Sequence, residues 1–182
     1  MPGLGDVSNL VMHLPAIPSN LPATTGVRTL RPDEDVALAA LLDAAFEEAW
    51  DVARVHAALL DDSTVDQTYV IANGNQLLAT ASARYLPDDW PDDGYLHWVG
   101  VHPDARGHGL GSQVVVAVLR HFAGAGRRGS ILETEDHRLA AIKTYLRLGY
   151  VPRYRNSDPS EFAEQESRWS AILPRLLRVR PG

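Results

Sequence analysis

The stretch that decides the fold is Val99-Gly100-Val101-His102-Pro103-Asp104-Ala105-Arg106-Gly107-His108-Gly109-Leu110-Gly111-Ser112. The pattern predicts the end of a strand, a glycine-rich turn and the start of a helix with an apolar face that continues to Ala123. Glycines at 107, 109 and 111 allow a ligand to approach the backbone closely. Because the first amide groups of a helix lack internal partners and face the positive end of its dipole, the turn suits a phosphate group.

Two common phosphate-binding motifs fit this stretch poorly. A Walker loop needs Gly-Lys-Ser/Thr, and the single lysine of the chain, Lys143, lies far away. A dinucleotide fingerprint needs GxGxxG after the first strand of a βαβ unit, whereas the spacing here is GxGxG and several strands are expected before it. A dinucleotide-binding protein stays open as an alternative.

The elements around the turn indicate an α/β fold in which a mixed, mostly antiparallel sheet of six to seven strands carries helices on both faces. The turn dipeptide Asn73-Gly74 predicts a hairpin, and Gly149 the end of a helix. Strands are expected at 27–30, 67–72, 76–85, 95–102, 130–134 and 150–154. Helices are expected at 36–46, 52–60, 110–123, 139–148 and from 158 to Pro174, which should end or kink the last one.

Charge is divided unevenly along the 182 residues, whose net charge is −6. Residues 1–100 carry four arginines against fifteen acidic residues, whereas residues 101–182 carry thirteen basic and eight acidic ones. The split suggests two ligands of opposite sign, and the overall acidity argues against a nucleic-acid binder. No cysteine is present, which excludes disulfides and a cysteine nucleophile. The short apolar runs predict no membrane span, so we expect a cytoplasmic protein.

The glycine turn, preceded by Val-x-Pro, resembles the Arg-x-x-Gly-x-Gly pyrophosphate loop of the GNAT superfamily of acyl-CoA N-acyltransferases, with Arg106, Gly109 and Gly111 at the motif positions. A second block supports the resemblance: an Ala-containing helix at 139–148 with Tyr145, then Leu148-Gly149-Tyr150. The two blocks span about residues 95–152. We expect a Pro-rich arm at 1–25, the GNAT domain at 26–155, and a C-terminal helix and tail at 156–182.

The resemblance implies acetyl-CoA as cosubstrate, bound where the strand before the loop splays from the strand after it. It implies that the backbone at Val99, Gly100 and Val101 contacts the acyl and pantetheine groups. The pyrophosphate is expected to bind the backbone amides of residues 106–112. His137 occupies the position at which many members have an Asn that contacts pantetheine. The residues implied to bind the loop end of the cofactor are Arg106, Gly107, His108, Gly109, Leu110, Gly111 and Ser112.

The resemblance also implies that Tyr145 donates a proton to the CoA sulfur, for which a phenol is a reasonable acid. Strict alternation along 95–101 predicts that Tyr95, His97, Val99 and Val101 share one side of their strand. The segment 95–101 further resembles the histidine-bearing strand of arylalkylamine N-acetyltransferases, which makes His97 the expected base. Glu133 and Glu135 are the alternatives. No spacing of the histidines predicts a metal site. With no cysteine in the chain, direct attack of the amine on the thioester is favoured over an acyl-enzyme.

The acceptor is expected to be a small-molecule primary amine. The segments 47–51 and 88–93 each combine acidic residues with a tryptophan, a composition that suits a cation. Trp50, Tyr95 and Glu133 are therefore the expected substrate contacts, with Asp92 and Asp93 attracting the amine. A non-catalytic acyl-CoA sensor with the same fold is the alternative function. The terminal segments suit a subunit contact, so a homodimer is expected.

Overall fold

The computed structural model describes residues 9–46, 48–154 and 159–177. The chain divides into one unit of residues 15–130 and a second that joins residues 1–14 to 131–182. The segment expected to be an arm is thereby split, since its residues up to Leu14 belong with the C-terminal part. Glu47, Asp158 and the terminal arginines at 178 and 180 lie outside the described residues.

The larger unit is built on antiparallel strands in the order β2-β3-β4-β5. Their bounds are β2 (Val27–Thr29), β3 (Val65–Asn73), β4 (Gln76–Arg84) and β5 (Asp93–Val101). The turn between β3 and β4 places Gly74 at φ 58°, so the predicted Asn-Gly hairpin is confirmed.

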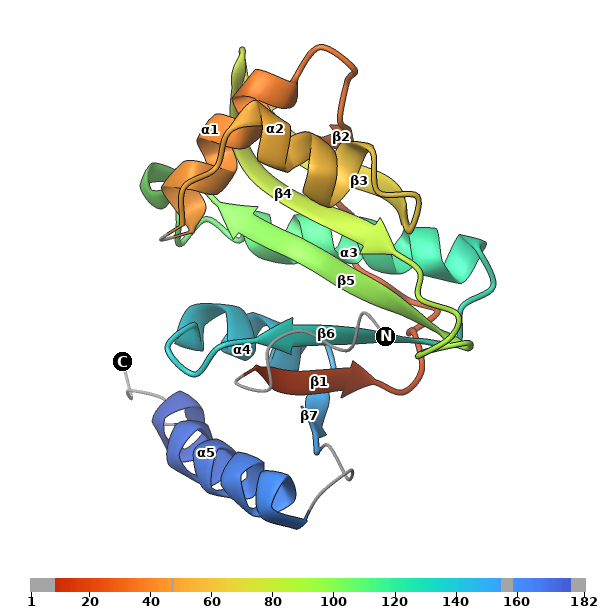
Figure 1. Ribbon diagram of the computed structural model, residues 1–182, viewed down its shortest axis with the longest axis vertical. Helices are drawn as coiled ribbons and strands as arrows, with labels where there is room; N and C mark the ends of the chain where they lie inside the picture. The colour runs from red at the N-terminus through yellow and green to blue at the C-terminus, as the bar shows by residue number, and fades with distance from the viewer. Residues whose placement is uncertain (1–8, 47, 155–158, 178–182) are drawn as a thin grey trace. The chain divides into compact units, whose positions relative to one another are not determined.

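Helices cover both faces of these strands. On one face lie α1 (Asp35–Ala45), α2 (Val52–Val55) and the π-helical turn η1 (His56–Leu60), and on the other lies α3 (Leu110–Gly124) (Figure 1). A Cβ atom at Gly100 would lie 3.3 Å from Ala45 and Phe46, whereas one at Gly94 would overlap Phe122 of α3. The predicted α/β fold with two covered faces is confirmed.

Strand β5 contains a β-bulge that the sequence did not reveal. Ser82 of β4 pairs with His97, but Thr80, two residues earlier, pairs with Gly100, so β5 carries one extra residue between these pairs. Trp98, in this interval, has φ 43°, the left-handed region that bulky residues rarely enter. The bulge therefore redirects the side chains of β5 at its centre.

The smaller unit holds three strands in the order β6-β1-β7, with β7 antiparallel to β1. Their bounds are β1 (Leu10–Leu14), β6 (Gly129–Thr134) and β7 (Val151–Arg153). Helices α4 (Leu139–Arg147) and α5 (Pro159–Leu177) belong to the same unit. Strand β1 was not predicted, because its four buried apolar residues, Leu10, Val11, Met12 and Leu14, show no regular alternation with polar ones.

Helix α5 continues past Pro174 to Leu177, so the proline does not end it. Among the described residues, no helix is both long and apolar enough to cross a membrane.

Candidate active site

The glycine-rich turn folds as the sequence predicted. A short helix η2 (Pro103–Ala105) precedes Arg106, and α3 begins at Leu110. Gly107 and Gly109 have φ angles of 84° and 75°, which disfavour residues with a Cβ atom. No heavy atom lies within 4 Å of a Cβ atom built on either glycine, so the backbone is open on that side.

The first turn of α3 is suited to an anion. Its N-cap is Gly109, which has no side chain to accept from the amide groups that follow. These groups retain the donor capacity that a phosphate can use, and the helix dipole favours negative charge there. Gly111 has a different role, because a Cβ atom at this position would lie 3.3 Å from Cγ2 of Val101 and would separate α3 from β5.

Two side chains of the turn make contacts within the larger unit. Arg106 is exposed and its Nη2 donates to the carbonyl oxygen of Ala45, at 3.3 Å, which ties the turn to the end of α1. The Nδ1 atom of His108 lies 3.0 Å from the carbonyl oxygen of Arg106. An open backbone, free helix-start amides and a neighbouring guanidinium together fit the pyrophosphate of a CoA-type ligand.

His97 lies half-buried on the α1/α2 face of β5, between two aromatic rings. The ring centroids of Tyr95 and Trp98 lie 5.7 and 5.3 Å from that of His97. Burial lowers the pKa of His97 to about 3; the positive charge of Arg84 adds to this effect, and Asp62 opposes it. The imidazole is therefore neutral at physiological pH and can accept a hydrogen bond.

A polar network next to His97 was missed by sequence reasoning. Arg84 donates from Nε to Oγ1 of Thr64 at 2.7 Å, and its Nη2 lies 3.3 Å from Oδ2 of Asp62. Thr64 in turn donates its backbone N–H and its hydroxyl to Asp62. Burial pushes the pKa of Asp62 up, but the Thr64 bonds and the charge of Arg84 outweigh it, and the pKa stays below its usual value. The network fixes a cation and an anion beside the imidazole.

The β-bulge corrects the alternation expected for β5. Residues directly opposite each other on paired strands point to the same face of the sheet. Thr80 and Ser82, two residues apart on β4, share a face, so their partners Gly100 and His97 lie on that face too. Val101 pairs with Ala79 and lies on the other side, towards Gly111 of α3. The prediction that Val101 shares a face with His97 is therefore wrong, because one extra residue shifts the alternation by one position.

Trp50 is a packing residue in this structure. Its side chain belongs to the core under α1 and α2, is 6% exposed, and meets Trp98 edge-on at 4.6 Å. The guanidinium of Arg54 lies 4.2 Å from the Trp50 ring centroid and is itself held by Glu48 and by the carbonyl of Ala49. Because the Arg54 guanidinium lies over the indole, an amine that contacts this face of Trp50 would have to displace it.

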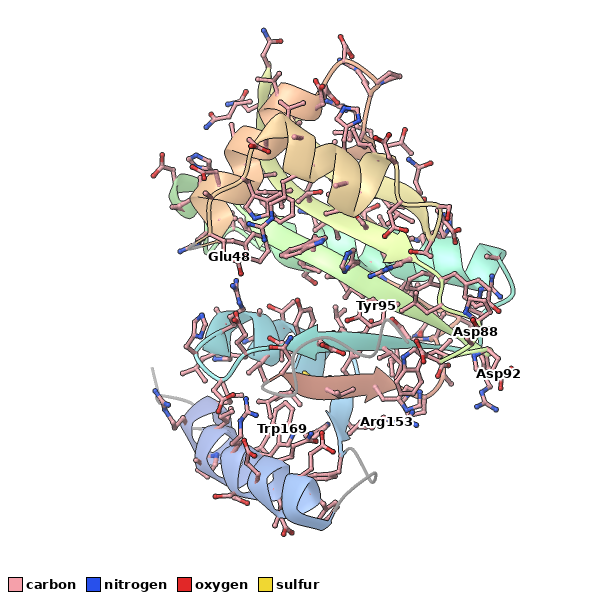
Figure 2. The ribbon with its side chains drawn as sticks, in the orientation of Figure 1. Glu48, Asp88, Asp92, Tyr95, Arg153 and Trp169 are labelled. Carbon is pink, nitrogen blue, oxygen red and sulfur yellow. The ribbon has the colours of Figure 1, made fainter. Side chains whose placement is uncertain are left out.

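Two aspartates of the acidic loop before β5 have a defined environment within the protein. Asp93 is the first residue of β5 and only 6% exposed. Asp92, labelled in Figure 2, has its carboxylate 3.8 Å from Arg128, and its carbonyl accepts from the Arg128 amide. Of the four aspartates at 88–93, Asp93 is therefore buried, while Asp88, Asp89 and Asp92 are exposed.

Tyr145 is placed by the end of α4. The amide of Tyr150 donates to the carbonyl of Tyr145 and that of Gly149 to Leu146, the two bonds of a Schellman motif. Gly149 adopts the φ of 96° that this motif requires, and the rings of Tyr145 and Tyr150 lie 5.8 Å apart. Burial raises the pKa of the Tyr145 phenol, so the group stays protonated across the physiological range. The helix end predicted at Gly149 is confirmed.

The other candidates of the smaller unit lie on β6 and in the loop after it. Oε2 of Glu133 accepts from Asn9 at 3.2 Å, and Glu135 accepts from Nε of Arg138. His137 is exposed, with Nε2 3.7 Å from Glu135. The smaller unit thus holds Glu133, His137 and Tyr145, while the larger unit holds His97, Tyr95 and the glycine turn.

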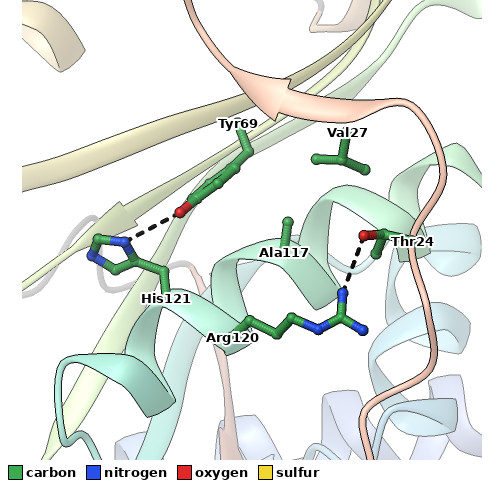
Figure 3. Close-up of a pocket in the computed structure, with 6 residues that line it drawn as sticks. All are labelled: Thr24, Val27, Tyr69, Ala117, Arg120 and His121. Carbon is green, nitrogen blue, oxygen red and sulfur yellow. Dashed lines mark hydrogen bonds between the residues drawn. The ribbon is translucent and has the colours of Figure 1, made fainter.

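A shallow hollow of about 350 Å³ lies on the α3 face of the larger unit (Figure 3). Tyr69 and His121 line it, with the phenol oxygen 3.3 Å from Nδ1 of the imidazole. Arg120 on its rim donates to Thr24 and to the carbonyl of Leu21. This face is opposite to the one that carries His97, so the hollow is separate from the predicted site. The described residues contain no cluster of three or more His, Asp or Glu side chains arranged to hold a metal ion.

Comparison with known proteins identifies the family. The model of the acetyltransferase (GNAT) family matches residues 36–150. The chain therefore belongs to the GNAT family, and the resemblance found in the sequence is confirmed.

Curated relatives and solved structures agree with this assignment. A mycothiol acetyltransferase of Nocardia farcinica is 39% identical over 67 residues, which are 37% of this chain and 22% of the relative. The mycothiol acetyltransferase of Streptomyces coelicolor is 29% identical over 138 residues, 72% of this chain and 44% of the relative. The chain thus spans less than half of either relative.

Two solved structures share the fold. A GNAT-family protein of Novosphingobium aromaticivorans superposes with a TM-score of 0.62 at 22% identity, covering 80% of this chain and 60% of that one. A GNAT-family acetyltransferase of Brucella melitensis, in complex with acetyl-CoA, gives 0.54 at 20% identity, covering 72% and 90%.

Proposed function

We propose that the protein is an N-acetyltransferase that moves an acetyl group from acetyl-CoA to the primary amine of a small molecule. The observation that carries the proposal is the open start of α3, where left-handed glycines expose helix-start amides beside Arg106. Membership in the GNAT family supports acetyl-CoA as the ligand of this turn.

The proposed cofactor contacts divide by chemistry. Amides of residues 106–112 and the Arg106 guanidinium hold the pyrophosphate. Backbone groups at Val99, Gly100 and Val101 pair with the pantetheine amides, and a backbone N–H near Val99 stabilises the thioester oxygen as it gains charge. His137, exposed in the loop before α4, is the proposed side-chain contact of the smaller unit. The splay between the two flanking strands stays a prediction.

In the reaction, a bond forms between the amine nitrogen and the acetyl carbon, the carbon–sulfur bond breaks, and the sulfur takes a proton. Tyr145 is the proposed acid, since its buried phenol is protonated at neutral pH and can donate its proton to the departing thiolate. His97 is the proposed base, acting through water on the amine proton; its low pKa keeps the imidazole unprotonated at neutral pH but also makes it a weak base. Glu133 and Glu135 are alternative bases. The absence of cysteine favours direct attack.

A small-molecule acceptor is supported by the curated relatives, which are named for mycothiol. Tyr95, on the His97 face of β5, and Glu133 are the proposed acceptor contacts. Homodimerisation and a cytoplasmic location also belong to the proposal; light scattering behind a sizing column tests the first, and fractionation of the source cells the second.

The proposal is tested by a screen of amines for release of CoA thiol from acetyl-CoA, paired with calorimetric titration of acetyl-CoA and NAD. We expect acetyl-CoA binding and turnover of at least one small amine. Tyr145→Phe should lower kcat with little change in KM for acetyl-CoA. His97→Ala should lower kcat by about 100-fold or more if it is the base.

The outcomes separate the alternatives. Acetyl-CoA binding without turnover of any amine, and indifference to Tyr145→Phe, would favour the sensor. Binding of NAD but not of acetyl-CoA would overturn the assignment. Since the pKa of His97 is about 3, the kcat profile should show no His97 ionisation between about pH 5 and 8. A limb in that range that disappears in His97→Ala would contradict the neutral imidazole.

A further inference from the structure

The loop between β6 and α4, residues 135–138, is short and carries the proposed cofactor contact His137. Within the loop, the amide of Arg138 donates to the carbonyl of Glu135, and that of Leu139 to His137. The N-cap residue of α4 is Arg138, which makes no side-chain capping bond. The start of the helix that bears Tyr145 is therefore not fixed by the usual local cap.

Besides the local bond from Arg138 to Glu135, a distant arginine holds this loop. Nε of Arg168, on α5, lies 3.1 Å from both carboxylate oxygens of Asp136, and Nη2 also donates to Oδ1. Such a fork fixes both the position and the orientation of the carboxylate. The side chain of Arg168 is 20% exposed, and the hydrogen bond it donates is the largest cause of the lowered pKa of Asp136.

Arg168 projects from a firmly seated part of α5. The buried residues of this helix fall at the spacing of one helical face, next to Arg168; they are Gln165, Trp169, Ile172 and Leu176. Trp169, labelled in Figure 2, is 1% exposed. The fork thus connects a loop of four residues to a helix anchored by its own apolar stripe. None of α5 lies within the residues matched by the family model, which end at 150.

We propose that α5 positions the cofactor loop, with Arg168 as a positioning residue that holds Asp136 and, through it, His137 and the first turn of α4. The inference rests on the proposed function, because it assigns a role toward acetyl-CoA to the segment outside the matched family region. Arg168 touches neither cofactor nor substrate in this proposal. It restricts the loop so that His137 and the helix of Tyr145 keep one arrangement.

The experiment compares Arg168→Gln, Arg168→Lys and Asp136→Asn in the full chain with Arg175→Gln, an exposed arginine on the last turn of α5. Acetyl-CoA affinity is measured by calorimetry without amine, turnover by thiol release, and loop protection by hydrogen exchange over residues 135–147. We expect Arg168→Gln to weaken acetyl-CoA binding or lower kcat by about tenfold and to speed exchange in that segment. Arg168→Lys, which keeps the charge but loses the fork, should recover part of the effect, and Arg175→Gln should change nothing.

The readouts separate the failures. If the wild type binds no acetyl-CoA, the proposed function fails, while hydrogen exchange still tests whether Arg168 holds the loop. If the wild type binds and all variants keep its affinity, kcat and exchange, the positioning role is overturned. A uniform rise of exchange over the whole smaller unit, with an equal loss of thermal stability, would also overturn it in favour of a purely structural role. Asp136→Asn, which preserves the volume of the side chain, carries the test if Arg168→Gln does not fold.

Discussion

Two regions of the molecule depend on left-handed glycines, and they use them in opposite ways. At the turn before α3, Gly107 and Gly109 have φ angles of 84° and 75°, and nothing lies within 4 Å of where their Cβ atoms would be. At the end of α4, Gly149 has φ 96°, and its Cβ atom would lie 3.3 Å from Cδ1 of Leu14.

The glycines of the first region leave the backbone accessible, whereas Gly149 closes the end of a helix against the core. Around the first pair the space is empty, so a ligand can approach the backbone amides, and we expect a side chain there to weaken the proposed binding. Around Gly149 the space is filled by the protein's own core, and the same φ angle serves to end a helix and to bring the Tyr150 ring next to that of Tyr145. Substitutions that change only conformation or only volume therefore have different consequences in the two places.

The largest effect is expected for Gly149→Ala. Holding alanine in the left-handed region costs about 1–2 kcal/mol, and the contact with Leu14 adds to this. We expect the free energy of unfolding to fall by about 2 kcal/mol in urea denaturation and kcat to fall with it, because Tyr145 loses its Schellman bond.

Gly126→Ala is the matched control. Gly126 follows α3 with φ 75° and has no atom within 4 Å of a built Cβ, so it reports conformational strain alone. An equal loss of stability in both variants, with kcat unchanged in Gly149→Ala, would remove the closure role of Gly149.

The next effect concerns access. Asparagine tolerates the left-handed region, so Gly109→Asn should leave unfolding within about 0.5 kcal/mol of wild type while placing a side chain where the ligand approaches. We expect acetyl-CoA affinity to fall about tenfold, measured by calorimetry. Gly74→Asn, in the hairpin turn at φ 58°, should be neutral in both measurements. Unchanged affinity in Gly109→Asn would argue against a ligand at this turn.

A smaller effect is expected for Arg106→Gln, because the side chain is exposed and partly committed to Ala45. We expect acetyl-CoA affinity to weaken about threefold to tenfold, and the difference from wild type to shrink as salt is raised. The measurement is calorimetry at low and high ionic strength. A salt-independent difference would assign Arg106 to holding α1 and not to the phosphate.

The smallest effect is a loss of stability at low pH, which arises in both units from arginine–carboxylate pairs. Hydrogen bonds from Arg28 and Arg168 lower the pKa values of Glu34 and Asp136 below their ordinary values. Their stabilisation is therefore complete above the unfolded pKa values of about 4 and is lost as pH falls through the lower folded values. We expect a shallow fall of the melting temperature below about pH 4, reduced in Asp136→Asn. If the melting temperature falls as steeply with decreasing pH in Asp136→Asn as in wild type, a contribution of Asp136 is excluded.

Sequence reasoning predicted the features that depend on interactions between residues close together in the chain. The turn before α3, the Asn73-Gly74 hairpin and the stop at Gly149 were predicted because left-handed glycines determine these structures within a few residues. The α/β fold followed from the apolar periodicity of the elements around them.

What it missed depends on partners far apart in the chain. Strand β1 is recognisable only beside β7, some 140 residues later, and the bulge at Trp98 only against β4. The Arg84–Asp62–Thr64 network and the Arg168–Asp136 fork likewise join separate elements. The composition of the two acidic segments also did not show that the Arg54 guanidinium lies over the Trp50 ring, or that the Asp92 carboxylate lies near Arg128.

The Schellman bond to Tyr145 has a thermal consequence. Tyr145 lies in the last turn of a nine-residue helix, and short helices fray from their ends well before a domain unfolds. Each time this turn opens, the proposed acid leaves its place while the rest of the protein stays folded. We therefore expect kcat to reach its maximum below the melting temperature, with the logarithm of kcat curving downwards against reciprocal temperature. In Gly149→Ala that maximum should move to lower temperature by more than the melting temperature does; an equal shift of both would show that the last turn opens only with global unfolding.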